Sequence, residues 1–430
     1  MVLFDFFAVI VSAYLCVRNY KNFTLSARYI LYFFFVLFYV FPLVLDCFYM
    51  MPDYTRTRTY YGFNLSYSDP ATRIIYDTAI LFSQHVLLHF QCRTAPVNCT
   101  TVELSKKTGK RHVVALVFFM LLPILLTFVL PVNKEILFFF QWRELQAFPV
   151  NSAISFLEKL SFIGVTSALL VLLDKRNKKI LRFVSLVCVC CNICIQGKRA
   201  ILFFSVVVTV IILIPGLRNC YLTIKKRRKL MRILSVSAVV AGIFMVIMTI
   251  WVKVTSRGYS ANEAVYMYTT VRIDFLRDDR VRMAIYSLLH PNQIHILDYL
   301  GQTIWPIPVW TFPFDYVFGY IGINPPSYAA YLSAGMEGLQ LEQSYLFMTP
   351  CFYAELVSNF GFLGFLLDPL LMVWLAKKAD EYAYPCNILI LVSYVALNLF
   401  AIKYIAYFLE FVLLICLLSR KKVTIGRIVL

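Results

Sequence analysis

Charged residues are scarce in this chain of 430 residues, where Asp, Glu, Lys and Arg together make up 15% of the sequence. Hydrophobic residues make up 60%, and the mean hydropathy is +0.73. No water-soluble core could bury that much apolar side chain, so lipid must be the solvent for most of the chain. The composition therefore predicts an integral membrane protein.

The sequence also lacks the motifs of several large function classes. It has no P-loop, no dinucleotide fingerprint, no HExxH and no GxSxG motif. Energy-coupled transport by an ATPase on this chain is therefore excluded. No RNP-like or zinc-finger signature is present, so nucleic acid is not an expected partner despite the formal net charge of +18.

The twelve cysteines lie mostly inside apolar runs, including the cluster Cys188, Cys190, Cys191 and Cys194. Helical spacing brings Cys190 and Cys194 onto one face, as a metal site would require. Packing as small hydrophobic side chains is the favoured interpretation, because no His or carboxylate lies in that run. No metal and no cofactor is expected.

Apolar runs long enough to cross a membrane predict an all-α, polytopic protein with about 11 transmembrane helices. The N-terminus lacks a basic region and a small-residue cleavage site, so the first run is expected to be retained as a span. The runs cover about residues 2–17, 29–50, 71–91, 112–131, 152–173, 180–196, 200–217, 230–254, 346–376, 386–402 and 405–419.

Lys and Arg concentrate in alternate connections between these runs, as the positive-inside rule predicts for the cytoplasmic side. The N-terminus is accordingly predicted outside and the C-terminus in the cytoplasm. Residues 255–345 form one large extracytoplasmic loop between helices 1–8 (residues 1–254) and helices 9–11 with the tail (residues 346–430). The basic residues of connections one, three, five and seven are Arg18 and Lys21; Arg93, Lys106, Lys107, Lys110 and Arg111; Lys175, Arg176, Lys178 and Lys179; Arg218 and Lys225 through Lys229.

The turn at Gly197 carries Lys198 and Arg199 on the predicted outer face, against the charge bias. Both side chains could simply extend into lipid headgroups. Alternatively they bind an anion, with Gly197 permitting a sharp turn and Arg199 offering a bidentate fork for phosphate or carboxylate. The anion site is the favoured interpretation, because misplaced charge in a membrane is usually functional.

The large loop contains a hydrophilic helical stretch rich in Arg and Asp, from Asn262 to about Leu289. Arg272 and Arg277 are either ligands of a phosphorylated substrate or solvated surface, and part of the set is expected to form ordinary surface ion pairs. His290 could act as a base, although a loop histidine is more often structural. The charged set comprises Arg257, Arg272, Asp274, Arg277, Asp278, Asp279, Arg280 and Arg282, and the aromatic stretch from Trp305 to Pro326 follows it.

Glu355 and Asn359 are four residues apart and share a helical face within or just outside the membrane. Gly361 and Gly364 allow a helix break or a close helix contact. A carboxylate at that depth needs a polar cavity or a cationic partner, so a salt bridge and a catalytic role are both open. Isolated polar residues in other spans are each expected to bond a neighbouring helix, among them Asp46, Asp77 and Asp368.

Taken together, these features resemble the O-antigen and capsular polysaccharide polymerases, the Wzy family. The points of likeness are the many spans, the turn Gly197-Lys198-Arg199, the Arg-rich outward loop and the run from Glu355 to Gly364. The resemblance implies a glycosyltransferase at the outer face of the bacterial inner membrane. It implies a substrate of oligosaccharide repeat units on undecaprenyl pyrophosphate, and a flippase and chain-length regulator proteins as partners.

The candidate residues fit that implied chemistry. Cations that strengthen their hold on a departing pyrophosphate could come from Lys198, Arg199, Arg257, Arg272 and Arg277, assisted by Asn359. Glu355, Asp274 or His290 could orient or deprotonate the acceptor hydroxyl. An O-antigen ligase, which transfers the same donor to lipid A core, remains an alternative. A flippase or exporter of lipid-linked sugar is an alternative from another class.

Overall fold

The computed structural model describes the following residues: 2–20, 27–48, 61–93, 110–130, 152–174, 176–197, 199–213, 247, 250, 251, 254, 260–263, 265, 276–290, 351–400, 402–418, 424, 425, 428 and 429. This part of the chain is almost entirely helical, as the sequence predicts. Its strands are the short β1 (Thr424–Ile425) and β2 (Ile428–Val429), which pair antiparallel.

The helices appear in the following order in the chain: α1 (Val2–Tyr20), α2 (Ala27–Phe35), the π-helix η1 (Val36–Val40), α3 (Phe41–Phe48), α4 (Tyr61–Ser68), α5 (Pro70–Arg93), α6 (Lys110–Val129), α9 (Ser152–Leu173), α10 (Lys179–Gln196), α11 (Arg199–Leu213), α14 (Asp278–Leu289), α18 (Phe352–Phe360), the 3-10 helix η5 (Gly361–Leu363), α19 (Gly364–Glu381), α20 (Cys386–Leu399) and α21 (Ile402–Leu418).

Within the described residues, five helical segments are long and apolar enough to cross a membrane. They are Ala27–Phe48, Arg111–Val129, Phe156–Leu173, Lys179–Gln196 and Phe352–Glu381, and shorter apolar helices cover Ala200–Leu213, Cys386–Leu399 and Ile405–Leu418. The protein is therefore an all-α, membrane-embedded protein. The count of about eleven spans and the large outward loop stay predictions.

The chain forms two compact units, each assembled from segments far apart in the sequence. Unit 1 comprises Met1–Asn98, Val265–Lys377 and Tyr394–Ala406, and unit 2 comprises Cys99–Ala264, Lys378–Ser393 and Tyr407–Leu430. The division into residues 1–254, 255–345 and 346–430 describes membrane topology and remains a prediction.

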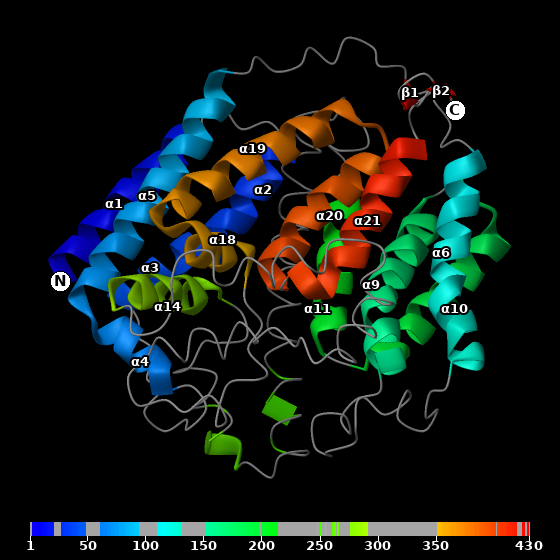
Figure 1. Cartoon of the computed structure of the whole chain (residues 1–430), viewed down its shortest axis with the longest axis horizontal. Helices are drawn as coiled ribbons and strands as arrows, with labels where there is room; N and C mark the ends of the chain where they lie inside the picture. Colours follow the sequence, from blue (N-terminus) through cyan, green and yellow to red (C-terminus); the bar gives the residue numbers. More distant parts are fainter. Residues whose placement is uncertain are drawn as a thin grey trace. The chain divides into compact units, whose positions relative to one another are not determined.

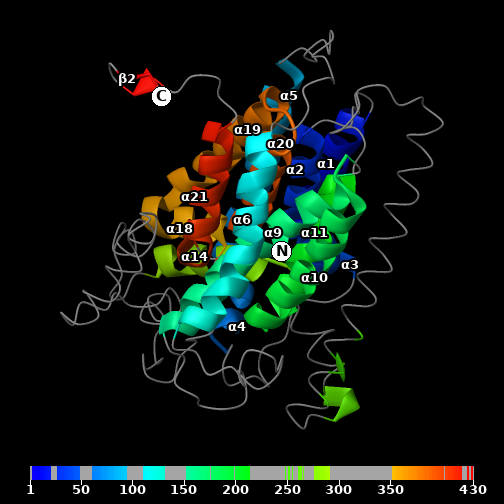
Figure 2. The ribbon, with the colours of Figure 1, turned by 90° about the vertical axis from the view of Figure 1, so that its right-hand side faces the viewer.

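In unit 2, α9 packs against α6, α10 and α11, and these helices run side by side in Figures 1 and 2. Asn192 of α10 donates hydrogen bonds to the carbonyl oxygens of Met120 (3.1 Å) and Cys188 (2.8 Å). A Cβ at Gly164 would lie 2.2 Å from Asn192 Oδ1, so only glycine permits this approach. Gly197 ends α10 with a left-handed φ of 63°, as the predicted sharp turn requires.

In unit 1, α1 packs against α3 and α5, and α14 packs against α4, α5 and α18. Figure 1 shows α14 lying crosswise to α5, with α4 below it and α18 above it in that view. α5 begins where Asp69 accepts hydrogen bonds from the backbone N–H (2.8 Å) and hydroxyl (2.6 Å) of Thr72. Pro70 occupies the first helical position, where its missing N–H costs nothing.

The long apolar segment that contains α18 and α19 is broken at two glycines. Gly361 has φ 59° and ψ −141°, in a region that side-chain-bearing residues avoid. A Cβ at Gly364 would lie 2.6 Å from the backbone of Leu356 and Val357. The break and the close contact that the sequence allowed are therefore both present.

Candidate functional site

The first residues of α14 are charged and nevertheless buried. Arg277, Asp278, Asp279, Arg280 and Arg282 are each at most 8% exposed. The surface ion pairs expected for part of the charged set are not among these five residues, because α4, α5 and α18 pack against the helix. Burial of charge is expensive unless the groups are paired, so each of these side chains needs a partner within unit 1.

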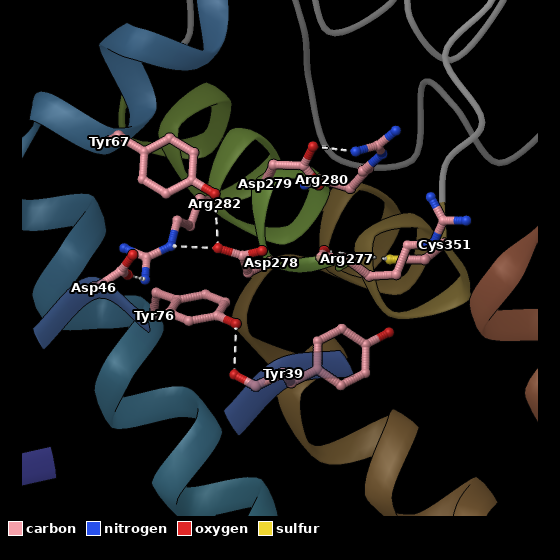
Figure 3. A network of polar contacts seen from close by, with 10 residues as sticks. All are labelled: Tyr39, Asp46, Tyr67, Tyr76, Arg277, Asp278, Asp279, Arg280, Arg282 and Cys351. Carbon is pink, nitrogen blue, oxygen red and sulfur yellow. Dashed lines mark hydrogen bonds and ion pairs between the residues drawn. The ribbon is translucent and has the colours of Figure 1, made fainter. Parts of the chain in front are cut away.

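Arg282 has the most complete set of partners, as Figure 3 shows. Its Nη2 lies 2.8 Å from Asp46 Oδ2 of α3, and its Nε lies 3.7 Å from Asp278 Oδ2. Its guanidinium lies over the rings of Tyr76 and Tyr67, 4.1 Å and 5.0 Å from their centroids. Burial alone would lower the pKa of Arg282, but Asp46 and Asp278 raise it above its ordinary value.

The two tyrosines beside Arg282 also fix their neighbours. Tyr67 donates its hydroxyl to Asp278 Oδ2 at 2.7 Å. Tyr76 donates to the carbonyl oxygen of Tyr39 at 2.9 Å. The prediction that Asp46 bonds a neighbouring helix is confirmed, because its partner Arg282 lies on α14. This side of α14 is thus held by ionic, aromatic and hydrogen-bonding contacts at once.

Arg277, immediately before α14, has fewer partners. Its backbone N–H donates to the carbonyl of Phe38 at 3.4 Å, within the π-helix η1, where the wider turn leaves such carbonyls available. Its Nη2 donates to the carbonyl of Leu399 at 3.0 Å. Among the described residues, its Nε has no hydrogen-bond partner. Burial and the neighbouring Arg280 both lower the pKa of Arg277.

Arg280 lies on the same turn as the start of α14 and forms an ion pair with Asp279. Its backbone N–H also donates to Asp279 Oδ1 at 2.8 Å. Two guanidinium groups, of Arg277 and Arg280, therefore share this end of the helix with the carboxylate of Asp279. Asp278 on the same turn is engaged by Tyr67 and Arg282. The start of α14 therefore brings two guanidinium groups close to each other inside unit 1.

Cys351 connects Arg277 to α18. Its Sγ lies 4.0 Å from the carbonyl oxygen of Arg277, and its own carbonyl accepts the backbone N–H of Glu355 at 3.0 Å. Cys351, Glu355 and Asn359 recur at four-residue spacing and are all buried, so they form one stripe along α18. Glu355 thus lies one helical turn from the point where α18 meets Arg277.

A further buried polar network lies in the same unit. Tyr39 donates its hydroxyl to Asn398 Oδ1, and Asn398 donates to the carbonyl of Tyr394 at 2.9 Å. The hydroxyl groups of Ser83 and Tyr353 are 2.7 Å apart, and the rings of Tyr353 and Tyr39 meet edge to face at 5.1 Å. This network connects η1, α5, α18 and the end of α20. Leu399, whose carbonyl accepts the hydrogen bond from Arg277, follows Asn398 at that end of α20.

His290 lies at the opposite end of α14 from Arg277. A helix of this length extends about 18 Å, and His290 ends it with a side chain that is 50% exposed. Its Nε2 is 3.8 Å from Asp69 Oδ2, and its ring packs on Tyr286 at 4.4 Å. Burial raises the pKa of Asp69, but the hydrogen bonds from Thr72 outweigh it and hold the pKa below its ordinary value. The structure therefore does not bring His290 to Arg277.

The other predicted site residues cannot be placed in this network. Arg199 begins α11 in unit 2, and its side chain lies outside the described residues. Lys198, Arg257, Arg272 and Asp274, with the aromatic stretch at residues 305–326, also lie outside them. Of the nine predicted residues, Arg277 lies immediately before α14, and Glu355 and Asn359 are buried on α18, which packs against α14.

Sequence reasoning named Arg280, Asp278 and Asp46 but did not place them beside Arg277 or Arg282, and it did not single out Tyr67 or Tyr76. The signal for Asp46 was its position as an isolated polar residue in an apolar run, which predicted a bond to a neighbouring helix. Tyr67 and Tyr76 had no such signal, because tyrosines are common in this chain and near membrane interfaces.

Within the described segments, no group of three or more His, Cys, Asp or Glu side chains could hold a metal ion.

Comparison with known proteins adds no relative to these observations: no family model matches the chain, nor does any curated protein or any solved structure.

Proposed function

We propose that this chain is a glycosyltransferase of the bacterial inner membrane that polymerises oligosaccharide repeat units carried on undecaprenyl pyrophosphate. The reaction attaches an acceptor hydroxyl to the first sugar of the donor chain and releases the pyrophosphate carrier. The departing pyrophosphate gains negative charge as the bond breaks. A catalyst therefore needs cationic donors already in place where that charge develops.

The observation that carries this proposal is the state of Arg277. A guanidinium has five N–H donors in a rigid fork, and burial makes each unused donor costly. Arg277 is buried, and its Nε has no hydrogen-bond partner among the described residues. Arg280 lies beside it, so this end of α14 offers two neighbouring guanidinium groups and an N–H donor that a phosphate group could use.

Glu355 is the favoured candidate for orienting or deprotonating the acceptor hydroxyl. It is buried on the stripe of α18 that begins at Cys351, which contacts Arg277. His290 is disfavoured for this role by its position at the far end of α14. Asp274 lies outside the described residues and remains a candidate from the sequence alone. Asn359, one turn beyond Glu355, is a candidate for contacting substrate.

The contacts of α14 support an outward-facing site. α14 packs on α4, and both helices lie in segments predicted to be extracytoplasmic. Asp46 lies at the predicted outer end of its span, and Cys351 and Leu399 lie at the predicted outer ends of two others. All three are in contact with residues 277–282. A lipid-linked donor reaches an enzyme of this type on that side of the membrane.

The proposal is tested by Arg277→Lys in the native host, because Lys keeps the charge but not the fork. We expect surface glycan with single repeat units in place of polymer. Arg176→Lys is the matched control, since Arg176 is half-exposed and pairs with Asp174 on the predicted cytoplasmic side, and it should leave the polymer unchanged. Full-length polymer from Arg277→Lys would contradict the proposed site.

The glycan profile of a deletion strain separates the three functions. A polymerase defect leaves one repeat unit attached to lipid A core or to the cell surface. A ligase defect leaves polymer on undecaprenyl pyrophosphate, not transferred to lipid A core. A flippase defect removes surface glycan and accumulates lipid-linked units on the cytoplasmic side. Either of the last two outcomes would overturn the proposed reaction.

A further inference from the structure

A buried cluster of charged groups lies where α1, α3, α5 and α14 meet, beside the site described above. Its carboxyl groups are those of Asp5, Asp46, Asp77 and Asp278, and its guanidinium groups are those of Arg73 and Arg282. We call these six residues the carboxyl cluster. The carboxyl side chains are all buried, so the cluster has little water to screen its charges.

The two guanidinium groups already have carboxylate partners. Arg73 of α5 forms an ion pair with Asp5 of α1. Arg282 forms one with Asp46 and a longer one with Asp278, and Tyr67 donates a further hydrogen bond to Asp278. Asp77 is the carboxyl group that remains: within the described residues it forms no ion pair, and its Oδ2 has no hydrogen-bond partner.

Asp77 lies four residues after Arg73 on the same face of α5, and Arg73 pairs with Asp5, so the carboxyl groups of Asp77 and Asp5 lie close to each other. A carboxylate can only accept hydrogen bonds, so two carboxyl groups can bond to each other only when one of them carries a proton. Charge counting leads to the same result. Among the described residues, the cluster has four carboxyl groups and two guanidinium groups, and burial disfavours the ionisation of all four carboxyl groups at once.

We propose that Asp5 and Asp77 form a proton-binding site, in which one proton is held between the two carboxyl groups with Asp77 as its principal carrier. In the described part of the chain, the titratable and charged groups near Asp77 come from α1, α3, α5 and α14. They are Asp5 of α1, Asp46 and Cys47 of α3, Tyr76 of α5 and Arg282 of α14. The site does not depend on the reaction proposed above.

Binding or loss of the proton changes the attraction between Asp77 and Arg282, and Arg282 is the residue whose ion pairs hold α14. While Asp77 is neutral, Arg282 is attracted mainly to Asp46 and Asp278. When the proton leaves, the carboxylate of Asp77 competes with them for the same guanidinium. The contacts of Arg282 with Asp46 and Asp278 drawn in Figure 3 are those expected while Asp77 is neutral.

The test is infrared spectroscopy of the full-length protein in detergent at neutral pH, comparing wild type with Asp77→Asn. A protonated carboxyl group has a carbonyl band distinct from the bands of an ionised carboxylate. The difference spectrum should show loss of one protonated-carboxyl band. Asp46→Asn is the matched control, and its difference spectrum should show loss of ionised-carboxylate bands.

Thermal unfolding of the same variants gives a second reading. Asp77→Asn replaces a neutral group by a neutral group of similar shape, so its unfolding temperature should stay close to that of wild type. Asp46→Asn removes a negative charge that balances Arg282, so its unfolding temperature should be clearly lower than that of wild type. The proposal is overturned if Asp77→Asn loses ionised-carboxylate bands or is destabilised as strongly as Asp46→Asn.

Discussion

Arg282 and Asp46 are 236 positions apart in the chain, and their side chains form a buried ion pair with a separation of 2.8 Å between Nη2 and Oδ2. This pair fixes the hydrophilic helix α14 against α3 inside unit 1. The neighbouring residues Arg277 and Arg280 are thereby held where α14 meets α18. The position of the proposed anion site thus depends on a contact that lies outside it.

We predict that Arg282→Gln strongly destabilises the protein, because it leaves the carboxylates of Asp46 and Asp278 without their cation. Breaking a buried pair costs about 3–5 kcal/mol. Arg176→Gln is the matched control, since its side chain is 50% exposed and exposed pairs contribute about 0–1 kcal/mol. Reversible unfolding in detergent measures the unfolding free energy of each variant. Equal losses for the two variants would contradict a buried role for Arg282.

The tyrosine ring beside Arg282 leads us to expect that two substitutions of Tyr76 lower the unfolding free energy by different amounts. Tyr76→Phe keeps the ring 4.1 Å from the guanidinium and loses the hydrogen bond to the Tyr39 carbonyl, at a cost of about 1 kcal/mol. Tyr76→Leu also loses the cation–π contact, which adds about 2 kcal/mol at a desolvated site. Unfolding free energies of the two variants should differ accordingly. A Phe variant as unstable as the Leu variant would show that the ring contributes nothing.

The glycine break after α18 predicts sensitivity at Gly364. Gly364→Ala places a Cβ 2.6 Å from the backbone of Leu356 and Val357, so the stripe bearing Glu355 must shift. Overpacking of this kind costs about 1–3 kcal/mol. Leu363→Ala, at an exposed neighbouring position, should change the unfolding free energy far less. Wild-type stability and polymer from Gly364→Ala would show that the close contact is not needed.

A further prediction rests on the sequence alone. Arg199→Ala should abolish polymer while single repeat units still reach the surface, because the turn at Gly197 is expected to present Arg199 to an anion. Arg272→Lys should be severely impaired for the same reason as Arg277→Lys. Glycan electrophoresis reads out both variants. Full-length polymer from Arg199→Ala would remove Arg199 from the site, and wild-type polymer from Arg272→Lys would assign Arg272 to the surface.

The sequence predicted those features that local chemistry determines. Long apolar runs predicted membrane helices, and Gly197, Gly361 and Gly364 predicted a turn, a break and a close contact because only glycine tolerates those backbone positions. It also predicted that Asp46 would find a helical partner. Each of these conclusions needed only residues adjacent in the chain.

The burial of α14 could not be predicted in the same way. Its composition is that of a solvated surface helix, and only the tertiary arrangement reveals that Asp46, Tyr67 and Tyr76 surround Arg282. Pairing between positions 46 and 282 leaves no periodic pattern in the sequence. The start of α14 was equally hidden, since the predicted helical stretch began at Asn262, whereas Arg277 is non-helical and α14 begins at Asp278.

The most direct measurement of the central claim is reconstitution of the purified protein in lipid vesicles with a single lipid-linked substrate, an oligosaccharide repeat unit on undecaprenyl pyrophosphate. Mass spectrometry then counts repeat units per lipid. We predict products with two or more units, one undecaprenyl pyrophosphate released for each bond formed, and loss of both with Arg277→Lys. Transfer of unchanged single units across the bilayer, without any longer product, would contradict the account.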